Sequence, residues 1–357
     1  MIRKLSQKSI MIAIILVTAL LTSTLFLQTI PAAKACETNG GFNTPGNVLI
    51  TDQFNNRVIE VNPFTNKIVW SFGTGDPANG VPGPHSIIGV NWAERLDDGL
   101  TVMAGTGTPA GASPQLPAGA VDNRVIVVNE AGKIVWQYGQ AGVTGSGPNE
   151  LNVPVAVIQL PNRDFLITDQ GNNRIIEVNQ AKQVVWFYGP ASGPGALNSP
   201  NSAELLQNGH ILIADLANNR VIEITKQGNI VWQYSKGINL AAFASRLPNG
   251  NTLITDSGNS RIIEVTPDKH VVFQYFTNKA LNSNSAPLPT NAVRLQNGNT
   301  IIADQFNDRV FIINDDKHII WQYGITNVPG NTKGLLNAPY TAFVIGDYTG
   351  QTPPPKT

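Results

Sequence analysis

The sequence predicts an all-β fold, a six-bladed β-propeller with four antiparallel strands in each blade. Three observations predict it: a unit that occurs six times, short β-branched runs of alternating polarity, and a spare strand at the C-terminal end of the repeats. One arginine marks each unit, at intervals of about 40 to 70 residues, and propeller blades recur with a period of this kind. These arginines are Arg57, Arg124, Arg174, Arg220, Arg261 and Arg309.

The unit around Arg309 shows the four strands that we expect in every blade. They are predicted at 289–295, 300–304, 309–313 and 318–323, because these runs are short, alternate in polarity and are rich in Val, Ile and aromatic residues. An Asn-Gly pair between the first two strands suits a two-residue hairpin turn, since both residues tolerate positive φ. The Asn-rich pair before each arginine tolerates left-handed backbone for the same reason.

The two ends of the repeat region predict how the ring closes. Residues 37–46 contain no strand before the first unit, whereas residues 339–345 form an extra inner strand after the sixth. We expect this C-terminal strand to join the first blade and complete it. The predicted propeller covers residues 47–347.

Two further features repeat around the ring, and we interpret them as structural. Five units place an aspartate five residues before the arginine, and the second unit has an insertion there, Gly105 to Ala120. The repeated Asp and Arg flank a turn, where they can pair or bind turn amides. One position of the fourth strand is aromatic in every unit, which predicts packing between blades. Its residues are Trp70, Trp136, Trp186, Trp232, Phe273 and Trp321.

Residues 1–35 have the pattern of an export signal. Three basic residues precede an apolar run at 10–27, and Ala-Lys-Ala at 33–35 fits a small-x-small cleavage site. The alternative is a single membrane anchor, because the apolar run is nearly long enough to span a bilayer. We therefore expect a secreted protein or one attached to the outer side of the cytoplasmic membrane.

Cys36, the only cysteine, would be the first residue after that cleavage site. This position makes it a lipidation candidate, and a signal anchor or a lipid on Cys36 would be the only membrane attachment. Residues 36–46 are predicted to be a linker. The proline-rich residues 348–357 are predicted to be a disordered tail.

The composition argues against some classes of partner. The 357-residue chain is 42% hydrophobic, only 13% of its residues are charged, and its formal net charge is zero. It lacks the basic stripe that a nucleic-acid interface requires, so we expect no nucleic-acid partner. No cofactor is expected either, because the sequence contains no phosphate-binding loop and no nucleophile motif.

The predicted loops are elaborated on one face of the propeller. We call this side the long-loop face. It carries the connections from the fourth strand of one blade to the first strand of the next, and those from the second strand to the third. The opposite, short-loop face carries only brief turns. Variable loops on a rigid scaffold commonly carry function. The long segments are 74–89, 105–120, 140–153, 190–199, 276–288 and 324–338.

The first residues of the inner strands should line the mouth of the central channel on the long-loop face. They combine aromatic and amide groups, which suit a sugar or a peptide better than an ion. The alternative is that Trp92 and Phe243 simply plug the channel. The candidate binding residues are Asn91, Trp92, Asn201, Phe243, Asn291 and Tyr340.

Histidines and charged residues bear on catalysis. Three of the four histidines are expected on the short-loop face, and only His85 on the long-loop face, so no metal site is expected. Glu94 and Glu204 share one inner-strand position and three arginines share the next; one of these sets should face the channel. The three arginines are Arg95, Arg246 and Arg294.

Residues 154–157 with 166–175 resemble the NHL repeat. The run 246–256, followed by a Val-Val-Trp-Gln-Tyr type strand, is also similar to aryl-sulfate sulfotransferase-like propellers. The resemblance covers nearly all of residues 45–347 and implies the propeller fold, but NHL propellers include scaffolds, sensor domains and a few enzymes. Members that act as sulfotransferases or amidating lyases rely on histidines, and only His85 could correspond to one here.

We therefore expect an exported, non-catalytic propeller that binds an extracellular or envelope protein, a peptide or a glycan through its long-loop face. The alternative is a diverged aryl-sulfate sulfotransferase-like or lyase-like enzyme at the channel mouth. In that case His85 would be the catalytic group, assisted by Arg95, Arg246 or Arg294.

Overall fold

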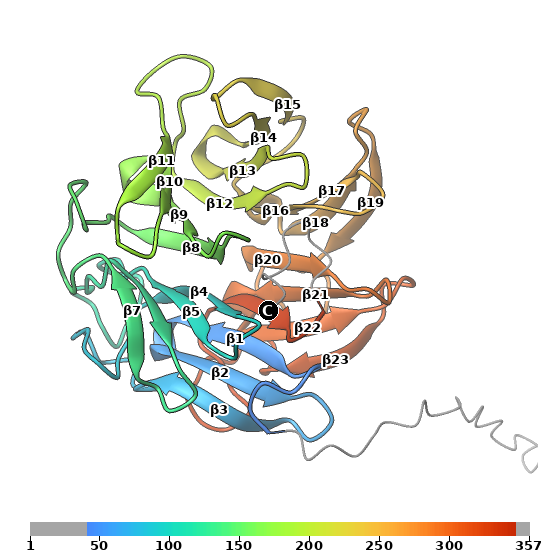
Figure 1. Cartoon of the computed structure of the whole chain (residues 1–357). Helices are drawn as coiled ribbons and strands as arrows, with labels where there is room; N and C mark the ends of the chain where they lie inside the picture. Colours follow the sequence, from blue (N-terminus) through green and yellow to red (C-terminus); the bar gives the residue numbers. More distant parts are fainter. Residues whose placement is uncertain (1–40, 348–357) are drawn as a thin grey trace, which may run out of the picture. The chain divides into compact units, whose positions relative to one another are not determined.

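A computed structural model describes residues 41–347, which form a ring of six four-stranded antiparallel sheets (Figure 1). This arrangement confirms the predicted six-bladed propeller. The predicted signal segment, Cys36 and the predicted tail lie outside the described residues. Within 41–347 the helices are short 3-10 turns, and none is long and apolar enough to cross a membrane.

Each blade runs from an inner strand beside the channel to an outer edge strand. Blade 1 contains β24 (Pro339–Val344), β1 (Val48–Asp52), β2 (Arg57–Asn62) and β3 (Lys67–Gly73). Blade 2 contains β4 (Val90–Arg95), β5 (Thr101–Gly105), β6 (Arg124–Val128) and β7 (Ile134–Tyr138), and blade 3 contains β8 (Pro154–Gln159), β9 (Phe165–Asp169), β10 (Arg174–Val178) and β11 (Val184–Tyr188).

The second half of the ring repeats this order. Blade 4 contains β12 (Pro200–Leu205), β13 (Ile211–Asp215), β14 (Arg220–Ile224) and β15 (Ile230–Tyr234). Blade 5 contains β16 (Ala241–Arg246), β17 (Thr252–Asp256), β18 (Arg261–Val265) and β19 (Val271–Phe276). Blade 6 contains β20 (Pro289–Arg294), β21 (Thr300–Asp304), β22 (Arg309–Ile313) and β23 (Ile319–Tyr323).

The ring closes as the sequence predicted. β24 pairs antiparallel with β1, so the last strand of the described chain is the inner strand of blade 1. The pairing places Val344 opposite Val48, and Thr341 N donates a hydrogen bond to Thr51 Oγ1 at 2.7 Å. Closure therefore removes the sheet edge that β1 would otherwise expose.

Short 3-10 turns connect the second and third strands in every blade except blade 2. The residue that follows each turn has the expected left-handed backbone; Asn56, for example, has φ 51° and ψ 46°. Asparagine tolerates this conformation, which explains the Asn-rich pair before each arginine. The turns are η1 (Gln53–Asn55), η2 (Gln170–Asn172), η3 (Leu216–Asn218), η4 (Ser257–Asn259) and η5 (Gln305–Asn307).

The turns between first and second strands differ from the prediction of a two-residue hairpin. In blade 4, Gly209 N donates to Leu206 O and Leu206 N donates to His210 O, and only Gly209 has positive φ (79°). This is a three-residue loop, a turn closed by a left-handed glycine. Asn208 instead uses its side-chain oxygen to accept the amide of His210 at 2.9 Å.

The outer-strand tryptophans join neighbouring blades, as their even spacing predicted. Trp70 Nε1 donates to Glu130 O in the next blade at 2.8 Å, and Trp321 Nε1 donates to Asn66 Oδ1 across the closure at 3.1 Å. Trp136, Trp186 and Trp232 make equivalent bonds. Phe273 lacks the N–H group, and its ring instead lies 5.2 Å from Lys317 Nζ of blade 6.

Three inner-strand arginines lie between blades and do not face the channel. Each pairs with a glutamate on the third strand of the preceding blade: Arg95 with Glu60, Arg246 with Glu223 and Arg294 with Glu264, at 2.8–3.0 Å. Side chains alternate across a strand, so the preceding inner-strand position faces the other way. Of the two sets, the glutamates Glu94 and Glu204 therefore face the channel.

Candidate functional site

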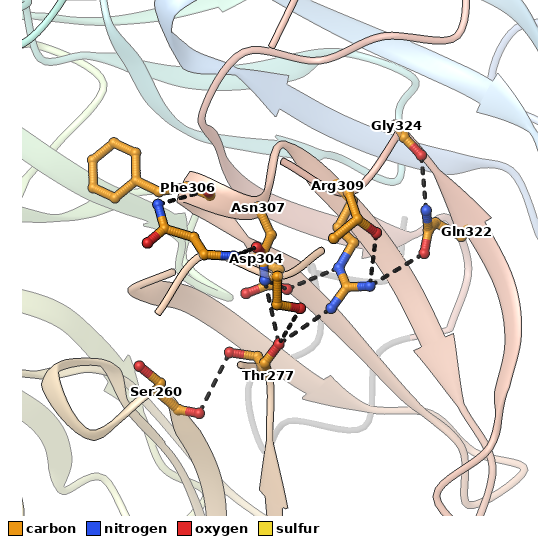
Figure 2. Close-up of polar contacts among 11 residues, drawn as sticks. Ser260, Thr277, Asp304, Phe306, Asn307, Arg309, Gln322 and Gly324 are labelled. Atoms are coloured by element: carbon orange, nitrogen blue, oxygen red, sulfur yellow. Dashed lines mark hydrogen bonds and ion pairs between the residues drawn. The ribbon is translucent and has the colours of Figure 1, made fainter. Parts of the chain in front are cut away.

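The repeated Asp, Asn and Arg residues fasten the long loops to the blades. In blade 6, Asp304 Oδ2 accepts hydrogen bonds from Asn307 Nδ2 at 2.8 Å and Arg309 Nε at 2.9 Å (Figure 2). Arg309 and Asn307 also donate to the carbonyl of Thr277, in the loop that leads into the blade. Charge-assisted bonds of this kind are among the stronger polar contacts in a protein. We call this Asp–Asn–Arg set a clamp.

Clamps in other blades hold the same loop from two sides. In blade 3, Asp169 Oδ1 accepts the amide of Asn152, and Arg174 donates to the carbonyl of Ser146. From the preceding blade, Asn123 Oδ1 accepts the amide of Val153 at 2.8 Å. Asn198, Asn239 and Asn337 donate their amides to Asp215, Asp256 and Asp52 in the same way.

Blade 2 builds its clamp from different positions. Gly105 stands where other blades have the aspartate, and Asp122 stands two residues before Arg124, where they have asparagine. A Cβ atom on Gly105 would lie 2.6 Å from Asp122 Oδ2, so the glycine makes room for that carboxylate. Asp122 pairs with Arg124 Nε at 2.5 Å and accepts the amide of Ile88 at 2.7 Å. The position of the acid has changed, while its contacts are kept.

Burial raises the pKa of the clamp aspartates in blades 1, 2, 3 and 6. Desolvation raises the pKa of Asp304 to about 6, although Arg309 and Asn307 oppose the shift. Burial likewise raises the pKa of Asp308 to about 6; the amide of Ala338 opposes this, and Asp52 and Asp304 add to it. An arginine pairs with the aspartate of every clamp, so we interpret these six aspartates as structural groups.

Of the 17 large apolar residues that are exposed among 41–347, ten lie on the outer strands of the blades and six lie on the long-loop face. Leu281 is 88% exposed and Val81 is 73% exposed. The six on the long-loop face lie along one side of the ring, from the junction of blades 5 and 6, through blade 1, to the junction of blades 2 and 3. They are Val81, Val121, Val143, Leu281, Ile325 and Val328. On the turns of the short-loop face, Phe64 is the one such residue among 41–347. Clustered exposed apolar side chains commonly mark interaction surfaces.

Amide groups at the channel mouth bind one another. Tyr340, on blade 1, donates its hydroxyl to Asn201 Oδ1 on blade 4 at 2.8 Å. Asn201 Nδ2 donates to Ala242 O, and Asn91 Oδ1 accepts from Gln53 Nε2, both at 2.7 Å. Burial raises the pKa of Tyr340 to about 12, so the phenol stays protonated and keeps donating. The mouth is thus crossed by a hydrogen bond between blades far apart in sequence.

Below this bond, three aromatic rings fill the upper channel. The ring of Trp92 lies 5.9 Å from that of Phe243 and 5.2 Å from that of Phe343, between centroids. All three side chains are buried. Trp92 and Phe243 therefore stand where the plug interpretation places them.

The structure distributes the predicted site residues as follows. Asn91, Trp92, Asn201, Phe243 and Asn291 are buried around the channel, and Tyr340 alone is partly exposed. Asn291 Oδ1 accepts the amide of Ala342 at 3.3 Å. A ligand reaching the long-loop face would meet Tyr340 and the loops first.

His85 lies apart from the channel residues. It is exposed in a turn whose flanking carbonyls, Gly83 O and Ser86 O, accept hydrogen bonds from Arg124. Arg95, Arg246 and Arg294 pair with glutamates between blades, so the structure does not bring His85 together with the arginines of the enzyme alternative. No cluster of three His, Cys, Asp or Glu side chains placed to hold a metal occurs within residues 41–347.

Comparison with known proteins supports the fold alone. No protein-family model matches the chain, and no curated protein matches it. A crystal structure of a protein of unknown function from Bacteroides caccae is 16% identical, with a TM-score of 0.58, covering 83% of this chain and 99% of that one.

Two lyase structures show a weaker similarity. A streptogramin B lyase structure has 15% identity and a TM-score of 0.50, over 82% of this chain and 86% of that one. Virginiamycin B lyase from Staphylococcus aureus has 15% identity and a TM-score of 0.49, over 79% and 85%. Function is not transferred at such identity, because one fold serves many activities.

Proposed function

We propose that this chain is a non-catalytic binding scaffold that holds a protein partner on its long-loop face. The observation that carries the proposal is the set of exposed apolar side chains on loops that the clamps fasten down. A surface already held in one conformation loses little entropy on binding, so its apolar contacts contribute more fully to affinity.

The partner is proposed to meet the protein outside the cell. The proposed location rests on the export pattern of residues 1–35, with Cys36 as a candidate lipid attachment site. The proposed partners include a peptide or a glycan of the cell envelope as well as a protein. Fractionation of cells that express the wild type or Cys36→Ser tests the attachment. Membrane association lost in the variant would support lipidation, and unchanged association would contradict it.

We also propose that the repeats are of the NHL type. The Asp, the Asn-rich pair and the Arg of each unit support this, because the clamp that they form recurs from blade to blade.

The binding proposal is tested by affinity capture with the full-length chain. The variant Leu281→Asp with Ile325→Asp places charges on two loops that both bond to Asn307, and so on one region of the face. We expect a partner captured by the wild type to be lost, at least tenfold, because an apolar contact surface does not accept unpaired carboxylates.

The matched control is Phe64→Asp on the opposite face, since Phe64 is 87% exposed and Leu281 is 88% exposed. Capture that survives the loop variant but fails with the control would assign the partner to the other face and contradict the proposal.

A further inference from the structure

A small cavity lies in the channel below the aromatic rings. It measures about 50 Å³, and inner strands of all six blades line it. Glu94 Oε2 and Ser202 Oγ line this region, and within residues 41–347 no hydrogen bond of normal geometry reaches either atom, although the indole N–H of Trp92 lies near enough to the Glu94 carboxyl to lower its pKa. Glu94 is 6% exposed and Ser202 is 2% exposed, so both are nearly withdrawn from solvent. Buried polar groups are rarely left unpaired, which points to a water molecule or a ligand at this site.

The charges around the cavity are of one sign. Its only titratable lining residues are Glu94 on β4 and Glu204 on β12; the residues from β8, β16, β20 and β24 carry no charge. Glu204 Oε2 accepts the amide of Arg246 at 2.9 Å. The negative charge of Asp97, in the turn after β4, adds to the rise in the pKa of Glu94. A low-dielectric site with two carboxyl groups favours a cation when these groups are ionised.

The walls restrict what kind of cation can enter. Phe243, Phe343, Trp92 and aliphatic side chains make most of the surface, and aromatic faces attract organic cations. A metal ion such as Ca²⁺ takes six to eight oxygen ligands, more than the site offers. The cavity is small and mostly apolar, which suits a compact charged group on an apolar stem.

We propose that this cavity binds a primary alkylammonium group, with Glu94 and Ser202 accepting its N–H donors and the aromatic walls covering its methylene carbon. The group could belong to a small free amine or to a lysine side chain. Both present the same chemistry, a compact cation on an apolar stem.

The ligand would enter from the short-loop face. The Tyr340–Asn201 bond crosses the channel at the other end. The site is therefore separate from the surface proposed to hold a protein partner.

Glu94 couples binding to pH. Burial raises its pKa to about 8, the indole of Trp92 opposes the shift, and Asp97 and Glu204 add to it. At pH 7 the carboxyl is mostly protonated and must lose its proton to pair with a cation. Binding at pH 7 should therefore release close to one proton per site, and affinity should rise about tenfold between pH 7 and pH 9. An alkylammonium stays charged over this range, since its pKa is about 10.4.

Calorimetric titration of the full-length chain with n-butylammonium chloride tests the proposal. We expect saturable binding with the stated proton release, measured in two buffers of different ionisation enthalpy, and no binding of n-butanol. A lysine-containing tripeptide distinguishes the two sources: binding equal to that of butylammonium indicates a protein side chain, and weaker binding indicates a free amine. Absence of saturable butylammonium binding, or equal binding of butanol, would overturn the proposal.

Variants separate the role of Glu94 from that of general surface charge. Glu94→Gln should weaken binding at pH 9 at least tenfold and abolish the pH dependence of the affinity. Ser202→Ala should weaken binding but leave its pH dependence intact. Glu130→Gln, which removes an exposed carboxylate from the short-loop face, should change neither the affinity nor its pH dependence. If Glu94→Gln does not fold, an unchanged affinity in Ser202→Ala still counts against the site.

Discussion

At the residue scale, Asp308 occupies a position that four other blades fill with asparagine, at Asn56, Asn123, Asn173 and Asn219. Its Oδ1 accepts the amide of Ala338 at 3.0 Å, which an asparagine oxygen does equally well in the other blades. Burial and the neighbouring acids Asp52 and Asp304 raise its pKa from 3.8 to about 6. The negative charge at this position therefore costs stability and adds no contact.

We expect Asp308→Asn to stabilise the protein above pH 6. Between pH 3.8 and 6 the folded state holds a proton that the unfolded state has lost, so Asp308 reduces the stability as pH rises through this range. The gain at pH 8 should be about 1 to 2 kcal/mol, discounted for partial solvent screening, with almost none at pH 3. Urea unfolding at the two pH values measures it; a loss of stability at pH 8 would contradict this account.

The sequence predicts clamp residues well and channel contacts poorly. Asp169 and Arg174 lie five residues apart on paired strands, so their ion pair follows from local structure. The Tyr340–Asn201 bond joins residues 139 apart and depends on how the ring closes. Glu94 and Glu204 could be placed at one position of the inner strand, but alternation alone did not say which of two neighbouring sets faces the channel.

At the scale of one element, blade 2 shows an exchange that the sequence contained but the repeat pattern concealed. Asp122 lies where the other units have Asn55, Asn172, Asn218, Asn259 and Asn307, and Gly105 lies where they have the aspartate. The second unit therefore keeps the acid at a shifted position, and it matches the repeat pattern only when both positions are compared.

We expect the usual clamp to be rebuilt by changing both positions. Gly105→Asp alone should destabilise the protein by about 3 kcal/mol or more, because it places a second buried carboxylate against Asp122. Adding Asp122→Asn should recover at least half of that loss, since asparagine can then donate to the new acid. A double-mutant cycle by thermal unfolding measures the coupling. Purely additive losses would show that the two positions do not exchange roles.

At the scale of the whole molecule, stability depends on closing the ring. β24 makes the inner edge of blade 1 and contacts blades 2 and 6 as well, so the first and last parts of the described chain fold together. The bonds from Trp321 to Asn66 and from Arg57 to the carbonyl of Asn331 cross the same junction. Repeat proteins rely on such neighbour contacts for stability.

Deleting residues 339–357 should therefore abolish cooperative unfolding, because β1 would be left as an unpaired edge beside the channel. The control deletes only residues 348–357 and should unfold like the full chain. Circular dichroism during thermal unfolding distinguishes the two. A cooperative transition within a few degrees of the full chain after the longer deletion would show that closure is not required.

Amide hydrogen exchange of the free full-length protein tests most directly whether the clamps hold the loops of the long-loop face. Four backbone amides in these otherwise irregular loops each donate to a clamp aspartate; they belong to Asn152, Asn198, Asn239 and Asn337. We predict that they exchange as slowly as amides inside the neighbouring strands, and that Asp169→Ala releases Asn152 while the other three stay protected. Rapid exchange of these four amides in the wild type would mean that the loops are not held, and the basis for a pre-organised binding surface would be lost.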